Sequence, residues 1–120
     1  MATLISKLTL SSTNATSDTL NITVTGTLSV GEPSVSLSRI SVATDAATNL
    51  RSTSDSSITY CYLKNMDTTN VITAKTDGGV AFLDLSPGEF AFIPVKGGVG
   101  IEVQADTAAC ILEYGYWTKS

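Results

Sequence analysis

Apolar and polar residues alternate along much of this chain, with the period of two that is typical of a half-buried β-strand. Between residues 20 and 30 every even position except Gly26 is apolar, and every odd position is Asn, Thr or Ser. Gly26 interrupts the apolar series and is a candidate for a bulge or a bend. Residues 1–12 show a similar alternation. The N-terminal quarter of the chain therefore has one apolar and one polar series of positions.

Further strands are expected at 35–42, 58–64, 71–75, 80–85, 90–95, 99–105 and 108–118. The apolar positions of the first of these change parity, which requires a bulge near Ser38 and Arg39 or cover on both faces. Residues 43–57 are polar and small, so they are predicted to form a loop that Leu50 pins. Ser86-Pro87-Gly88-Glu89 has Pro and Gly in the order of a type II turn.

No segment shows sustained helical spacing, and turn signals recur about every 8–12 residues, which is typical of an all-β sandwich or barrel. A length of 120 residues fits one domain. We therefore predict a single-domain antiparallel β-sandwich over residues 19–120. Residues 1–18 are predicted to form an N-terminal arm that pairs with the sheet edge of a neighbour.

The composition narrows the classes of partner. Charged residues make up only 15% of the chain, Ser and Thr fill 33 of its 120 positions, and the net charge is −4. Nucleic-acid binding is not expected, because the seven basic residues are scattered and form no stripe. No apolar run approaches the roughly 20 residues that span a bilayer, and residues 1–12 do not resemble a signal peptide. We expect synthesis in a cytoplasm, with Cys61 and Cys110 reduced.

The chain contains no histidine, which removes the commonest general base and metal ligand. No S-x-x-K motif occurs, and two cysteines cannot form a zinc site. The carboxylates that could work in pairs are Asp84, Glu89, Glu102 and Glu113, all expected to face solvent. The loop residues that could bind calcium are Asp67, Asn70 and Asp77, or Asp45 and Asn49, but such residues usually form Asx turns. We predict neither enzymatic activity nor a cofactor or metal.

Aromatic residues offer the strongest candidates for an interface. All eight lie between Tyr60 and Trp117. Alternating tyrosines of this kind commonly pack a core edge or a subunit interface, although they could also form a platform for a sugar. The residues predicted at interfaces come from both ends of the chain: Leu4, Leu8, Leu10, Tyr114, Tyr116 and Trp117.

Three stretches of the C-terminal half resemble small β-rich virion proteins of tailed bacteriophages, of the capsid cement, decoration or fibre type. They are Tyr60–Asn65 with Asp67–Asn70, Phe82–Pro94 with its Pro-Gly-Glu turn, and Gln104–Ala109 followed by Leu112–Tyr114. The resemblance covers residues 58–117. It implies a jelly-roll-like sandwich and carries no catalytic residues.

This resemblance implies a cement or decoration protein that bridges and stabilises subunits of the major capsid protein. Location on the capsid surface after assembly in the host cytoplasm, and a homo-oligomer, with a trimer favoured, are expected with it. Weak contacts gain strength when a shell repeats them. The alternative is a carbohydrate- or receptor-binding module of a tail, a fibre or the head surface, which would expose its aromatic residues.

Overall fold

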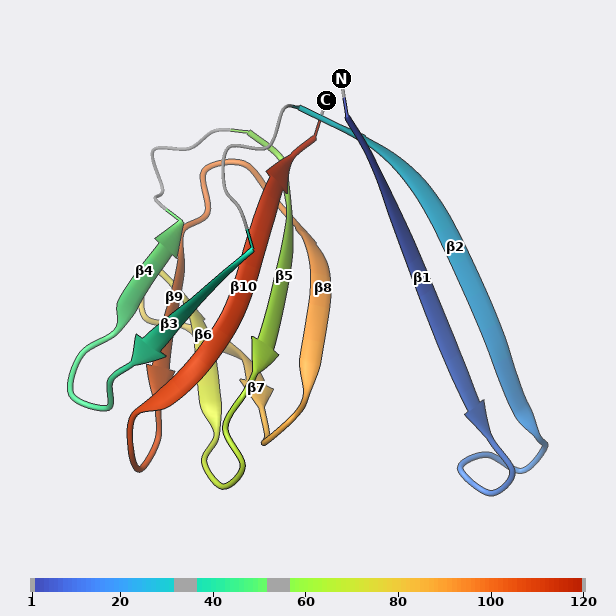
Figure 1. The fold of residues 1–120 in the computed structure, drawn as a ribbon, viewed down its shortest axis with the longest axis horizontal. Coiled ribbons are helices and arrows are strands. Elements are labelled where there is room, and N and C mark those ends of the chain that lie inside the picture. The colour runs from blue at the N-terminus through green and yellow to red at the C-terminus, as the bar shows by residue number, and fades with distance from the viewer. Residues whose placement is uncertain (1, 32–36, 52–56, 120) are drawn as a thin grey trace.

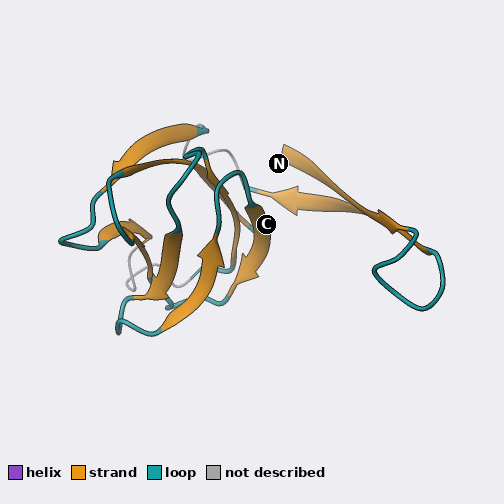
Figure 2. Ribbon diagram, turned by 90° about the horizontal axis from the view of Figure 1, so that it is seen from below, coloured by secondary structure: helices purple, strands orange, loops and turns teal. Residues whose placement is uncertain are grey.

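The computed structural model describes residues 2–31, 37–51 and 57–119. These residues form strands and connecting turns, with no helix among them (Figures 1 and 2). No helix in the described residues is therefore long and apolar enough to cross a membrane. The prediction of an all-β protein is confirmed.

Eight of the strands form a sandwich of two antiparallel sheets, as predicted. One sheet has the order β3-β10-β5-β8, and the other has the order β4-β9-β6-β7. Successive strands of the chain cross between the sheets, except that β6 and β7 pair within one sheet, and this is the jelly-roll order. The bounds are β3 Ser38–Val42, β4 Thr48–Arg51, β5 Thr59–Asn65, β6 Ile72–Thr76, β7 Ala81–Leu85, β8 Phe90–Val95, β9 Ile101–Ala105 and β10 Cys110–Thr118.

The core lies between these two sheets and consists of the inward positions of their strands. Its fully buried large side chains include Leu63, Ile72, Ile101 and Leu112. Burial alternates strictly along β9, and also along β5 and β6 except that Tyr60 is buried as well and Thr76 is half-buried. The alternation arises because successive side chains of a strand point to opposite faces. The period of two therefore identifies which residues hold the sandwich together.

The two remaining strands form a separate hairpin. Strand β1 (Ala2–Ser12) pairs with β2 (Leu20–Val30) through eleven antiparallel residue pairs. Figure 1 shows this hairpin projecting beside the sandwich. The division between arm and sandwich thus follows Val30, where the sequence placed it at residue 18. Register is unbroken through Gly26, which pairs with Ser6, so this glycine forms no bulge.

One predicted loop contains a strand. Within the segment 43–57, residues Thr48–Arg51 form β4 and pair with β9, with a register shift between Asn49 and Arg51. Leu50 and Arg51 are both buried, and the Arg51 guanidinium donates hydrogen bonds to the carbonyl oxygens of Lys96 and Val99. Tertiary packing has overridden a weak local pattern here.

Two other expectations concern turns and register. The turn at Ser86–Glu89 is confirmed: Glu89 N donates to Ser86 O (2.9 Å), and Gly88 has the positive φ of 80° that a type II turn requires. In β3, Ile40 is half-buried against the core and Val42 is buried. The parity change upstream of them involves Val35, which lies outside the described residues.

Asn65 joins several turns at one end of the sandwich. Its buried side-chain amide donates from Nδ2 to Asn70 O (2.8 Å) and Leu85 O (2.9 Å). Its Oδ1 accepts from Asp67 N (2.9 Å), and its backbone carbonyl accepts from Gly88 N. One side chain thus satisfies three backbone groups, two in the loop between β5 and β6 and one at the end of β7.

We predict that Asn65→Ala lowers the free energy of unfolding by about 2–4 kcal/mol, because buried backbone groups lose their partners. Urea unfolding followed by tryptophan fluorescence measures this change. Thr68→Ala, at an exposed position of the same turn region, is the control and should change stability by less than about 0.5 kcal/mol. Equal effects of the two substitutions would contradict the role assigned to Asn65.

Candidate assembly interface

The outward faces of the two sheets differ in chemistry. On the β4-β9-β6-β7 sheet the outward side chains are mostly polar or charged. Lys75 Nζ donates to Gln104 Oε1 (2.7 Å), and Thr73 Oγ1 donates to Asp84 Oδ1 (2.8 Å). Phe82 is the large apolar exception on β7. This face has the side-chain composition typical of an ordinary solvent-exposed surface.

The outward face of the other sheet is aromatic. The strand registers place five aromatic side chains on three adjacent strands, and we call them the aromatic face: Tyr60 and Tyr62 on β5, Phe90 and Phe92 on β8, and Trp117 on β10. Phe90 is 65% exposed and Phe92 is 36% exposed, Tyr62 and Trp117 are half-buried, and Tyr60 is buried. The rings of Tyr60 and Phe92 stack at a centroid distance of 5.9 Å. Large apolar groups gathered in this way on a surface typically mark an interaction site.

A polar chain borders the aromatic face. The Tyr62 hydroxyl donates to Glu113 Oε1 (2.9 Å), and Arg39 Nε donates to Glu113 Oε2 (3.0 Å). The hydrogen bonds from Arg39 and then Tyr62 lower the pKa of Glu113. Burial, followed by the hydrogen bond to Glu113, raises the pKa of Tyr62. Both groups keep their ordinary protonation states at neutral pH, so this chain fixes the orientation of the Tyr62 ring.

The hairpin arm has an apolar face of its own. Its register pairs even positions with even positions, so every apolar residue of the two strands except Ile5 lies on one side. Ile5 lies on the other side and is 67% exposed. Near the root the side chains of the apolar face are buried or half-buried. Towards the tip, the directly paired Leu8–Val24 and Leu10–Ile22 are each more than 40% exposed.

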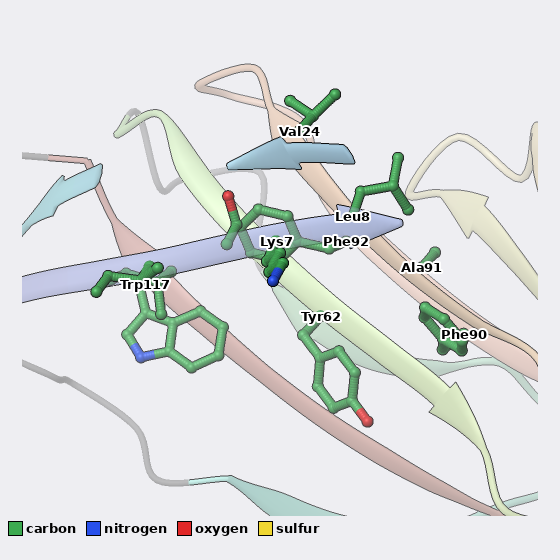
Figure 3. A pocket seen from close by; sticks show the side chains of 11 residues that line it. Lys7, Leu8, Val24, Tyr62, Phe90, Ala91, Phe92 and Trp117 are labelled. Atoms are coloured by element: carbon green, nitrogen blue, oxygen red, sulfur yellow. The ribbon is translucent and has the colours of Figure 1, made fainter. Parts of the chain in front are cut away.

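The arm and the aromatic face line a common groove of about 540 Å³ (Figure 3). Leu4, Leu8 and Val24 contribute from the arm, and Tyr62, Phe90, Phe92 and Trp117 contribute from the sandwich. Lys7 is the one charged residue of this lining. A groove of this size and composition suits an apolar segment or side chains of a partner.

Three of the residues predicted at interfaces meet in this groove: Leu4, Leu8 and Trp117. Leu10 lies nearer the arm tip and is exposed. Tyr114 packs against the core, and Tyr116 lies on the same side of β10 as Tyr114, opposite to Trp117. Neither of these tyrosines lines the groove.

Sequence reasoning did not single out Phe90 and Phe92. The signal was available, because every residue of β8 is apolar, which leaves apolar side chains on both faces of a strand. In an edge strand only one of those faces reaches the core.

The remaining candidate groups form no reactive cluster. Among the described residues, no three of the Cys, Asp and Glu side chains lie together as a metal site would require. Asp67 accepts backbone N–H bonds from Thr69 and Asn70 in an Asx turn, and these bonds lower its pKa. Glu89 accepts from Ser86 N, and Asp84 is exposed.

The two cysteines are buried free thiols. Burial raises the pKa of Cys61 to about 12 and also raises the pKa of Cys110. A thiol that stays protonated is a poor nucleophile. Neither cysteine therefore contributes a reactive group at neutral pH.

We predict that Glu113→Gln lowers the pKa of Tyr62, because the variant removes the negative charge that opposes ionisation of the phenol. Titration of tyrosinate absorbance at high pH measures the change. Asp84→Asn, which neutralises an exposed carboxylate on the other sheet, should leave the curve unchanged. An unchanged curve for Glu113→Gln would contradict the hydrogen-bonded chain described above.

Comparisons with known proteins leave the site to be judged on its own chemistry: no family model, no curated protein and no solved structure matches this chain.

Proposed function

We propose that this chain is a bacteriophage virion structural protein, a capsid cement or decoration protein that bridges subunits of the major capsid protein. The observation that carries the proposal is the apolar arm beside the aromatic face. Apolar and aromatic surfaces of this kind are typical of contacts between proteins, and less typical of active sites or of surfaces that remain in solvent. The resemblance of residues 58–117 to auxiliary virion proteins is the reason that the proposal places this contact in a virion.

The architecture supports an assembly role in two ways. A rigid sandwich can sit on a shell while the hairpin reaches across to a neighbouring subunit. The jelly roll also occurs in many viral capsid proteins, although a fold by itself does not fix a function. Repetition over a shell would turn modest apolar contacts into strong avidity.

A carbohydrate- or receptor-binding module is the second candidate, and the exposed rings of Phe90 and Phe92 favour it. Sugar sites combine such rings with several hydrogen-bonding groups that fix orientation. In this groove the Tyr62 hydroxyl already donates to Glu113, and the other polar groups of the lining are the Ser6 hydroxyl, the Lys7 ammonium and the indole N–H of Trp117. The groove therefore suits a protein surface better than a glycan.

We predict that the chain co-sediments with virions at a copy number comparable to that of the major capsid protein. Particles from the lysate would be banded on a density gradient, and each fraction would be quantified by mass spectrometry. A known internal tail protein provides the low-copy reference.

The possible copy numbers separate the candidates. A few copies per particle would place the chain at the tail or a vertex and favour the receptor-binding candidate. Absence from the particle band would overturn the virion proposal.

A further inference from the structure

The arm and the aromatic face are complementary surfaces that the same chain holds apart. Both are apolar, and the groove between them stays open. A two-stranded hairpin is marginally stable in water unless another layer covers its apolar side. The exposed pairs Leu8–Val24 and Leu10–Ile22 are therefore incomplete as a packed layer.

The root of the arm is fixed to the sandwich. Gly31 N donates to Thr118 O (2.8 Å), and Val30 forms a β-bridge with Lys119. Val30 is only 2% exposed. Together with the continuous ladder between β1 and β2, these contacts hold the arm at an angle to its own sandwich, as Figure 1 shows. Closing the groove within one chain would require these root contacts to break.

The size and charge of the surfaces also fit a second copy. The strands of the hairpin are each 11 residues long, and their outer halves, residues 6–12 and 20–26, present an open face about 24 Å long and about 10 Å wide. If each copy supplies both its arm and its aromatic face, the contact buries about 500 Å² per copy, or about 1,000 Å² in total, which is the size of a weak or transient protein interface. Residues 2–31 carry only Lys7 and Asp18 as charged side chains, so charge repulsion does not oppose the contact.

We infer that the groove is an interface between copies of this chain, in which the apolar face of one copy's arm packs on the aromatic face of the next. The inference rests on the proposed assembly function, for which it names the self-contact. The exchange buries Leu8, Val24, Phe90 and Phe92 together and gives the hairpin its missing second layer. Tyr62, whose hydroxyl donates a hydrogen bond to Glu113, also lines that contact.

Charge substitutions on the arm provide the first test, with the purified full-length chain in sedimentation velocity experiments. Wild type is expected to form a discrete oligomer. Leu8→Glu should raise its dissociation constant at least tenfold, because a carboxylate would be buried without a partner. Thr9→Glu is the matched control, since it adds the same charge to the adjacent residue on the opposite face of β1. Equal effects of the two variants would overturn the inference.

The aromatic face is tested in the same way. Phe90→Lys, at a position 65% exposed within one chain, should weaken association as Leu8→Glu does. Phe82→Lys changes a 47% exposed phenylalanine on the other sheet and should leave association intact. A monomeric wild type at all concentrations would overturn the inference, as would association that only Phe82→Lys disrupts.

Disulfide trapping distinguishes contact between copies from closure within one copy, and it does not depend on the charged variants. Leu8→Cys chains and Phe90→Cys chains are mixed and mildly oxidised; the native cysteines are buried and do not compete. A covalent heterodimer between the two variants is expected. A third chain carries both Leu8→Cys and Phe90→Cys. A disulfide that forms only within this double variant would show that the arm closes on its own sandwich, and would overturn the inference. A homodimer of the Leu8→Cys variant alone would show that arms pair with arms, and would also overturn it.

Failure of this inference is distinguishable from failure of the proposed function. Self-association is measured on the purified chain, whereas the virion role is measured by copy number in particles. A monomeric chain that is abundant in virions would retain the function and overturn the self-contact. An arm-exchanged oligomer that is missing from virions would support the self-contact and overturn the proposed function.

Discussion

The apolar face of a two-stranded hairpin needs a second layer, and this requirement governs how the molecule can work. In the sandwich each sheet covers the other, so Leu63 and Leu112 of one sheet and Ile72 and Ile101 of the other are fully buried. The β1–β2 hairpin has the same alternation but no opposing sheet, so its outer half leaves leucine, isoleucine and valine in water. Burial of apolar surface is the dominant favourable term in both folding and association, so it favours completing this layer with a partner.

The sandwich supplies a surface suited to that role. Polar side chains predominate on the outward face of the β4-β9-β6-β7 sheet, where Phe82 is the large apolar exception on β7. Phe90, Phe92 and Trp117 lie on the outward face of the other sheet, towards the arm. Glu113 orients Tyr62 at the margin of this face. The sandwich thus has one mainly polar outward face and one aromatic outward face, and the arm projects beside the sandwich (Figures 1 and 2) and lines a groove with the aromatic face.

Period-two alternation allowed most of the fold to be predicted, because a half-buried strand records its inward face in the sequence. It failed at β4, where only Leu50 and Arg51 are buried and the guanidinium of Arg51 binds carbonyl groups remote in sequence. It also misplaced the end of the arm. Residues 20–30 would show the same alternation in a strand of the sandwich and in a strand of the hairpin. Only their pairing with β1 shows that they belong to the hairpin. The groove was half predictable: Leu4, Leu8 and Trp117 were identified, but which outward face Phe90 and Phe92 share with Tyr62 depends on strand order.

Hydrogen exchange of the arm amides at several protein concentrations tests the central claim most directly. The account predicts that the backbone N–H groups of β1 and β2 exchange rapidly when the chain is dilute and become protected as its concentration rises, while the amides of β5 and β9 stay protected throughout. Protection of the arm that is equally strong at every concentration would mean that the hairpin is already complete within one chain, and it would contradict the account.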